Sequence, residues 1–508
     1  MTSSELSLVA AIALVCLLTV LGGIYGLRLS RTTSDFYVAG RAVGPWRNAS
    51  AIGGEYLSAA SFLGVAGLLY ASGVSMLWFP VGYTLGYVVL ACMVAAPLRR
   101  SGAYTVPDFA ELRLESRAMR LLTSVLVVLI GWLYLLPQLH GAGIAVTNLT
   151  GAPSWVGNVL VSTVVTINVV SGGMRSVTLV QAVQYWVKLA AIAIPALVLI
   201  GLWVASGSPA PTMPTPVSLQ GVGMHTYSTY SLILALCLGT MGLPHVVVRF
   251  YTNPDGRGAR RTALAVIGLL GAFYLFPPIY AVLGRVYLPE LPPGMLAEEI
   301  VLELPHLAAP GLLGDCLVVV LAVGAFAAFL STASGLAVAI TGVVDQDIIR
   351  PRLNRMLGSD VDGIASFRLA ALVSMLIPSI IALLVGRVGL ATTVGLAFAV
   401  AASTLCPLIV LGVWWRGLSV TGAAAGMIVG AATSLLGVAV TLSQVPVPQP
   451  WALWFAQPAA WSVPMAFFTA CLVSLATPGR VPTHTLRTMT RLHTPENVSL
   501  SLTRRGGV

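Results

Sequence analysis

The sequence predicts an all-α polytopic membrane protein with about thirteen transmembrane helices. Hydrophobic residues make up 57% of the chain and charged residues only 9%, whereas soluble domains carry about 25% charged residues. Apolar segments of about 20 residues or more, the length that crosses a bilayer, recur from one end of the chain to the other. Most connections between them are short, so we expect a compact helix bundle without a separate soluble domain.

The apolar segments are separated by short polar or basic stretches, which set their approximate limits. The segments 118–148 and 311–344 exceed the length needed to cross a bilayer. Tilt, kinks or extra turns outside the bilayer are therefore expected in both. The thirteen predicted spans are 6–28, 48–70, 73–97, 118–148, 154–174, 183–205, 226–250, 262–287, 311–344, 364–386, 390–415, 419–441 and 459–477.

The formal net charge of +10 reflects basic residues that lie between apolar segments, so it indicates topology and lipid contact rather than nucleic-acid binding. With the N-terminus outside, all of the 27 basic residues except Arg285 and Arg387 fall in cytoplasmic connections, at cytoplasmic helix ends or in the tail. The acidic loop 288–310 then lies outside. The sequence therefore predicts an outside N-terminus and a cytoplasmic C-terminus.

The six cysteines are scattered singly along apolar segments. They show no metal-ligand spacing, so each is expected to pack in the core. The sequence also lacks a nucleotide-binding glycine pattern, and we expect no bound organic cofactor and no nucleic-acid partner.

The second span contains Gly53, Gly54 and Glu55, the only acid well inside an apolar segment. Adjacent glycines loosen a helix, because glycine lacks a Cβ and costs about 1 kcal/mol relative to alanine. A broken transmembrane helix with an ionisable group at the break is typical of a transporter binding site. The alternative is a packing face of small residues with a neutral, hydrogen-bonded glutamic acid.

The seventh span contains a second predicted break, at Gly239, Gly242 and Pro244. Spans two and seven are five apart. Because five is odd, spans 2–6 and 7–11 would insert with opposite orientation, as in inverted-repeat transporters whose discontinuous helices meet near the midplane. The alternative is that glycine and proline are merely common in transmembrane helices.

This repeat divides the chain into five regions. A first transmembrane helix and cytoplasmic loop are followed by two repeats of five spans, two additional helices and a basic cytoplasmic tail that we expect to be mobile. The five regions are 1–47, 48–205, 206–415, 416–477 and 478–508.

The ninth span contains two adjacent hydroxyl residues, Ser331 and Thr332. Isolated hydroxyls in a membrane helix usually bond back to a carbonyl one turn earlier. Two neighbouring hydroxyls are also able to supply oxygens to a monovalent cation, together with carbonyls freed at the Gly54–Leu57 turn. Spacing alone favours neither interpretation.

Four stretches resemble the solute:sodium symporter family, with its acetate and monocarboxylate permease branch most similar: GEYLSAASFLG (54–64), SGGMRSVTLVQAVQ (171–184), GLPHVVVRFYT (242–252) and VGLAFAVAAS (394–403). The resemblance covers roughly residues 34–440. It implies thirteen helices with a five-plus-five inverted-repeat core, and secondary active transport by alternating access in the plasma membrane.

The resemblance also implies a sodium site. Backbone carbonyls of Gly54, Leu57 and Ala328 and the hydroxyls of Ser331 and Thr332 would bind the ion. The presence of both hydroxyls favours sodium over a proton as the coupling ion. Proton coupling stays open, because Glu55 could itself load and release a proton.

The suggested substrate is a small monocarboxylate such as acetate, propionate or pyruvate, with another small solute, for example an amino acid, as the alternative. One lone acid does not form a catalytic set, so we expect no enzyme. Arg249 is expected to snorkel at a cytoplasmic helix end, and His140 and His245 are expected to be structural. The predicted substrate contacts are Gly53, Glu55, Tyr56, Ser58, Gln138, Thr240 and Met241.

Overall fold

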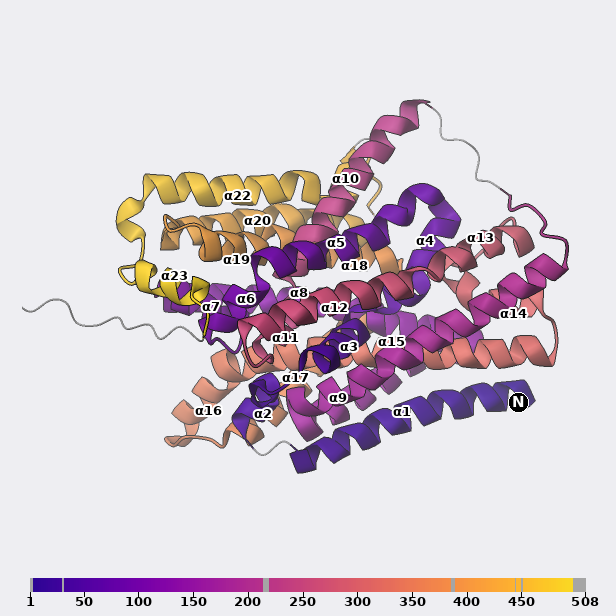
Figure 1. Cartoon of the computed structure of the whole chain (residues 1–508), viewed down its shortest axis with the longest axis horizontal. Coiled ribbons are helices and arrows are strands. Elements are labelled where there is room, and N and C mark those ends of the chain that lie inside the picture. The colour runs from indigo at the N-terminus through magenta and orange to yellow at the C-terminus, as the bar shows by residue number, and fades with distance from the viewer. Residues whose placement is uncertain are drawn as a thin grey trace, which may run out of the picture.

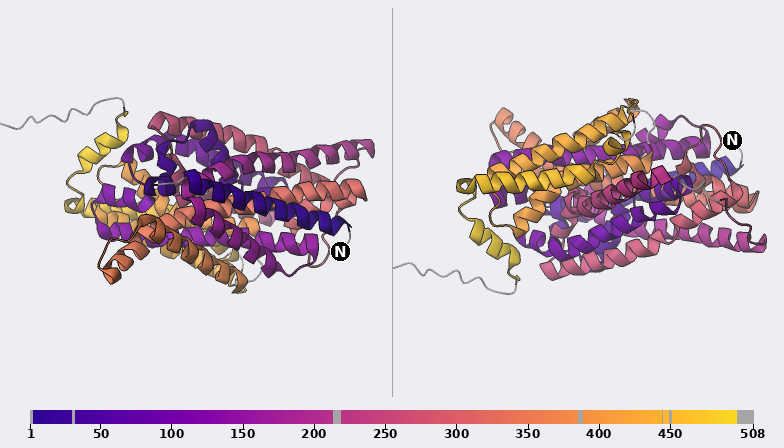
Figure 2. Two further views of the ribbon diagram at one scale, coloured as in Figure 1. Left: turned by 90° about the horizontal axis from the view of Figure 1, so that it is seen from below. Right: turned by 90° about the horizontal axis from the view of Figure 1, so that it is seen from above.

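The protein is a bundle of helices that run roughly along its long axis (Figures 1 and 2). The computed structural model describes residues 3–29, 32–212, 219–384, 389–443, 445–448 and 451–496. Every regular element in these ranges is helical, which confirms the predicted fold class. Arg387 and residues 497–508 of the tail lie outside the described residues.

Ten helices of the described chain are long and apolar enough to cross a membrane, or up to twelve if each of two bent pairs is one span. Most of their bounds agree with the predicted spans to within a few residues. The ten candidate spans outside the bent pairs are formed by α1 (Ser3–Leu29), α5 (Trp78–Met93), α8 (Arg117–Thr150), α9 (Ser154–Ala205), α12 (Gly256–Tyr274) together with α13 (Pro277–Tyr287), α15 (Leu312–Val344), α17 (Gly363–Leu384), α18 (Leu390–Ser403) together with α19 (Leu405–Trp414), α20 (Val420–Leu442) and α22 (Ala459–Ala476).

Helix α9 covers two of the predicted spans, 154–174 and 183–205, with 52 residues. Its backbone is interrupted at Gly173, where φ is +55°. Only glycine enters this region without strain, and an added Cβ would collide with Phe36. The glycine therefore allows the kink, and the count of thirteen spans stays a prediction.

Both predicted helix breaks are present. Helix α3 (Pro45–Tyr56) and the segment Ala60–Ser72, a π-helical turn followed by α4 (Val65–Ser72), are bent by 69°. Helix α10 (Leu219–Gly242) is followed by α11 (Pro244–Tyr251) with a bend of 42° between Thr226–Gly242 and α11.

The glycine pair of span two has a different role from the one expected. Helix α3 continues through Gly53 and Gly54 and ends only at Tyr56. A Cβ on Gly54 would collide with the carbonyl of Gln181. The glycine therefore lets α3 approach α9 closely, and the chain leaves the helix at Leu57, three residues later.

The N-terminal end of α1 and the C-terminal helix α23 (Thr485–His493) lie at opposite ends of the bundle (Figures 1 and 2). Arg113 donates a hydrogen bond to the Thr485 hydroxyl over 3.2 Å, so this part of the tail is a docked helix. The expectation of a mobile tail was wrong for these residues. The orientation in the membrane stays a prediction.

Short basic helices gather at the same end as α23 (Figure 1). They are α6 (Ala95–Ser101) and α16 (Arg350–Leu357). Helix α7 (Val106–Leu114), which carries Asp108, Glu111 and Arg113, lies beside them. The acidic connection 288–310 forms a 3-10 turn and α14 (Ile300–Ala308) at the opposite end.

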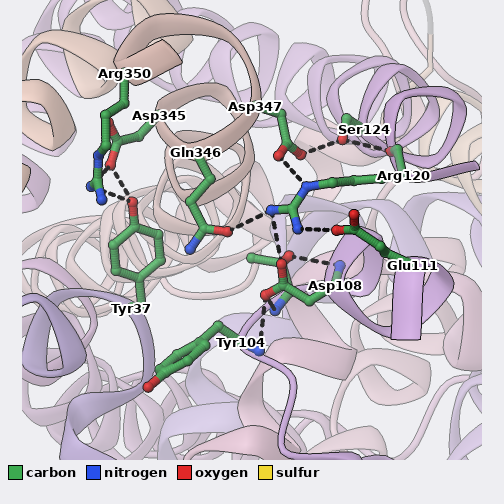
Figure 3. A network of polar contacts seen from close by, with 11 residues as sticks. Tyr37, Tyr104, Asp108, Glu111, Arg120, Ser124, Asp345, Gln346, Asp347 and Arg350 are labelled. Atoms are coloured by element: carbon green, nitrogen blue, oxygen red, sulfur yellow. Dashed lines mark hydrogen bonds and ion pairs between the residues drawn. The ribbon is translucent and has the colours of Figure 1, made fainter. Parts of the chain in front are cut away.

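A polar network fastens the end of α15 to α7 and α8 (Figure 3). The chain continues from α15 into a π-helical turn, Asp345–Ile349. Arg120 of α8 donates to Asp347 over 2.5 Å and to Glu111 over 2.7 Å, and it pairs with Asp108 over 2.8 Å. One guanidinium therefore holds three carboxylates from two elements, which fixes α15 relative to α8.

Replacing Gly173 by alanine tests the requirement for the kink. We expect Gly173→Ala to destabilise the detergent-purified protein by about 1–3 kcal/mol, because the positive φ and the Phe36 collision both oppose a Cβ. The thermal unfolding midpoint measures this. Gly201→Ala is the matched control, since it lies in the same helix with open space around an added Cβ. Equal midpoints for the two variants would contradict the assignment.

Candidate functional site

The two broken helices meet at the centre of the bundle. The Tyr56 hydroxyl, at the end of α3, lies 2.7 Å from the Thr240 hydroxyl near the end of α10. Both residues are fully buried. The convergence of the two breaks agrees with the predicted arrangement, while the inverted repeat itself stays a prediction.

The break after α3 leaves backbone oxygens without their usual helical donors. The Ser58 N–H donates to the Tyr56 carbonyl over 2.9 Å and not to Gly54, four residues earlier. The Ser331 hydroxyl of α15 lies 2.6 Å from the Gly54 oxygen and 3.1 Å from that of Ala328. The Thr332 hydroxyl donates to the Glu55 carbonyl over 2.5 Å. The break and Ser331–Thr332 are thus in direct contact.

A lysine that the sequence analysis assigned to a cytoplasmic helix end lies among these oxygens. Lys188 of α9 is fully buried. Its Nζ donates to the Gly54 carbonyl, to the Leu57 carbonyl over 2.7 Å and to the Ser331 hydroxyl over 2.9 Å. Three acceptors match the three N–H donors of an ammonium group.

This arrangement does not fit a sodium ion bound by the same oxygens. Two monovalent cations 3 Å apart repel each other by about 5–6 kcal/mol at an effective dielectric constant of 20. Gly54, Leu57 and Ser331 already surround the Lys188 ammonium. Of the five predicted sodium ligands, Gly54, Leu57 and Ser331 contact the Lys188 amino group, and Ala328 contacts Ser331. Thr332 instead donates to the Glu55 carbonyl, and the sodium site stays a prediction.

A buried ion pair lies next to the lysine. Arg249 of α11 donates to the Glu55 carboxylate over 2.5 Å, and both side chains are at most 3% exposed. The same guanidinium donates to the Thr178 hydroxyl over 2.7 Å and to the Gln181 side chain. The expectation that Arg249 snorkels at a helix end was wrong, because its charge is neutralised inside the bundle.

Helix α9 presents Thr178, Gln181 and Lys188 to this centre. The Gln181 amide also donates to the Ser331 carbonyl over 2.6 Å. Spacings of three and seven residues place side chains on one face of a helix, so a polar stripe was visible in the sequence. It was missed because Lys188 was counted with the basic residues of cytoplasmic ends. The centre contains one carboxylate and two cationic groups, with one positive charge in excess.

An aromatic cluster surrounds Tyr56. Its ring centroid lies 4.8 Å from that of Tyr87 and 5.2 Å from that of Tyr83, and Tyr134 packs 5.2 Å from His245. Several buried polar atoms near the breaks have no hydrogen-bond partner among the described residues. They are Glu55 Oε1, Tyr83 OH, Tyr87 OH and both ring nitrogens of His245. Within the described part of the chain, the hydroxyls of Ser58 and Tyr134 interact only with each other. Unpaired buried groups are costly, so a small polar ligand would satisfy them.

The other predicted substrate contacts differ in whether their polar groups already form hydrogen bonds within the protein. The Gln138 side chain accepts from the Ala59 N–H over 3.0 Å and donates to the Tyr134 carbonyl over 3.3 Å, so it closes the α3 break. Met241 is fully buried. A Cβ on Gly53 would meet the ring of Tyr185. His140 lies 2.8 Å from the Ala382 carbonyl, and its role as structural stays a prediction.

A sequence profile of the sodium:solute symporter family matches residues 36–430. The chain belongs to this family of transporters. It is 30% identical over 485 residues to a monocarboxylic acid transporter of Corynebacterium glutamicum, and the alignment covers 88% of each chain. It is 29% identical over 434 residues to the uncharacterized symporter YwcA of Bacillus subtilis (strain 168), and this alignment covers 84% of each chain.

Solved structures show the same fold at low sequence identity. A Na⁺-coupled sialic acid symporter in a substrate-bound outward-open state matches with a TM-score of 0.70 at 15% identity, over 93% of this chain and 97% of that one. MHP1, a nucleobase-cation-symport-1 family transporter in a closed conformation, matches with a TM-score of 0.53 at 14% identity, over 90% of this chain and 98% of that one. The chain is therefore a multi-pass membrane protein with a transporter fold.

Breaking the Glu55–Arg249 pair tests its role in stability. We expect Arg249→Met to destabilise the purified protein by about 3–5 kcal/mol, because it leaves the buried Glu55 carboxylate without its directly hydrogen-bonded partner. The double variant Glu55→Gln/Arg249→Met should recover much of the lost thermal midpoint. Arg175→Met is the control, since Arg175 pairs with Asp35 but is 44% exposed, and exposed pairs contribute at most about 1 kcal/mol. A double variant less stable than Arg249→Met would argue against the pair.

Proposed function

We propose that this chain takes up a small monocarboxylate, such as acetate, propionate or pyruvate, together with a cation. The observation that carries the proposal is the buried polar centre between the two broken helices, where the cations of Arg249 and Lys188 outnumber the Glu55 carboxylate. A monocarboxylate anion complements that excess charge. The similarity to a monocarboxylic acid transporter supports the same substrate class.

The substrate would bind beside the α3 break in the aromatic cluster. Tyr87 has a hydroxyl group there without a partner among the described residues, and the hydroxyls of Ser58 and Tyr134 have only each other. Hydroxyl donors suit a carboxylate. Gly53, Tyr56, Thr240 and Met241 would form the walls. The tight aromatic packing favours a solute of few atoms. The alternative substrate is another small organic solute, such as an amino acid. Competition of that unlabelled solute with the uptake of labelled acetate distinguishes the two substrate classes.

The cation has two candidates. Sodium is the ion of the family name, and Gly54, Leu57, Ala328, Ser331 and Thr332 supply oxygen atoms of the kind that hard cations prefer. A proton is the second candidate. The specific observation that favours it is the Lys188 ammonium, which already contacts three of these five oxygens.

We further propose that transport proceeds by alternating access in the plasma membrane, with the N-terminus outside and the C-terminus in the cytoplasm. The bends at the α3 and α10 breaks support a five-plus-five core made of residues 48–205 and 206–415. Residues 1–47, 416–477 and 478–508 lie outside that core in this proposal. The basic helices at one end of the bundle support the orientation.

Uptake into liposomes tests the function. Purified protein is reconstituted, and labelled acetate or pyruvate is offered under an inward sodium gradient or an inward proton gradient, imposed one at a time. We expect accumulation above the external concentration under at least one gradient, since a symporter couples the two fluxes. Protein-free liposomes are the control. Absence of uptake under both gradients would reject this substrate class.

Removing one hydroxyl of the aromatic cluster tests the substrate site. We expect Tyr134→Phe to raise the KM for the monocarboxylate about tenfold or more, because a hydrogen bond to a charged group contributes about 1.5–3 kcal/mol. Initial uptake rates over a range of concentrations measure it. Tyr251→Phe is the matched control, because its hydroxyl is also buried but interacts electrostatically with Asp108 and Arg41, outside the cluster. Equal KM values for the two variants would remove Tyr134 from the site.

A further inference from the structure

The Lys188 side chain joins three separate segments of the bundle. It extends from α9 to the carbonyls of Gly54 and Leu57 at the α3 break and to the Ser331 hydroxyl of α15. Lys188, Leu57 and Ser331 are fully buried, and Gly54 is also buried. Its three N–H groups have one acceptor each, so the ammonium needs no further ligand.

The identity of these acceptors distinguishes this lysine from an ordinary structural one. Two are carbonyls that the helix break frees from backbone pairing, and the third is one of two adjacent hydroxyls on α15. These are three of the five oxygens on which the sequence resemblance places a sodium ion. An ammonium group and a sodium ion carry the same charge and both require oxygen acceptors, so each excludes the other.

The surrounding hydrogen bonds orient the oxygens toward the lysine. The Ser331 hydroxyl lies 2.6 Å from the Gly54 carbonyl, where it donates its proton and leaves a lone pair for Nζ. Gln181 holds the Ser331 carbonyl over 2.6 Å. Arg249 neutralises Glu55 directly, so Lys188 provides the excess positive charge of the centre.

We propose that the Lys188 ammonium is a built-in cation that fills the cation site of this chain, so that sodium neither binds there nor is required for transport. Only the transport part rests on the proposed function. The binding part concerns the folded protein alone and is tested without any substrate.

Sodium binding is measured by the thermal unfolding midpoint of the purified full-length protein, in sodium chloride and in potassium chloride at equal ionic strength. A ligand that binds only the folded state raises the midpoint. We expect equal midpoints for the wild-type protein in the two salts. Lys188→Ala removes the amino group from the oxygens of Gly54, Leu57 and Ser331. We expect the unfolding midpoint of this variant to rise by several degrees as the sodium concentration increases.

Lys188→Met is the matched variant, because it removes the charge but keeps most of the side-chain volume. We expect it to show no sodium response. Uptake of labelled acetate by the wild-type protein should be equally fast when potassium replaces sodium on both sides of the membrane, whereas Lys188→Ala should transport faster with sodium than with potassium.

A sodium-specific rise of the wild-type midpoint that Ser331→Ala abolishes would overturn the inference, since sodium would then bind the same oxygens. A folded Lys188→Ala protein without a sodium response would also count against it. The wild-type comparison is informative even if the lysine variants fail to fold. If no monocarboxylate is taken up under any gradient, the proposed function fails and the midpoint comparison still decides the occupancy of the site.

Discussion

The centre of this protein depends on two backbone carbonyls that lack helical donors inside a dry bundle. Helix α3 ends at Tyr56, and the Gly54 and Leu57 oxygens turn toward α9 and α15. Leaving such groups unpaired away from water costs several kcal/mol each, so the fold must supply a donor or a cation. Lys188 and Ser331 supply donors from two other helices. The break in one helix thereby determines which side chains its neighbours must present.

The charges around the break form a single arrangement. Glu55 without a partner would oppose an anionic ligand, but Arg249 pairs with it from the second broken helix. Neither the acid nor the arginine is stable alone in the bundle interior. Together they join α3 to α11, and Lys188 leaves one uncompensated positive charge. The electrostatic preference for an anion thus follows from the same contacts that hold the broken helices in place.

Local sequence signals were sufficient to predict most of the membrane helices and the two broken spans, while the count of thirteen stays a prediction. Apolar length defines a membrane helix, and Pro244 with its neighbouring glycines interrupts one here. The role of Gly54 was predicted incorrectly, because its close approach to Gln181 is a property of helix packing. Lys188 and Arg249 were both assigned to cytoplasmic ends, since a charge count along the chain does not show which face of a helix is buried.

The predicted sodium ligands illustrate what a family resemblance transfers. Gly54 and Leu57 lie in one of the stretches that carry the resemblance, whereas Ser331 lies outside all four. The Ser331 hydroxyl nevertheless lies 2.6 Å from the Gly54 oxygen. Lys188 lies four residues beyond the nearest quoted motif, on a helix that contributes none of the expected ligands. A matching set of oxygens therefore identifies a site for one positive charge without identifying its source. The source depends on whether a neighbouring helix places a long cationic side chain within reach, and here α9 does.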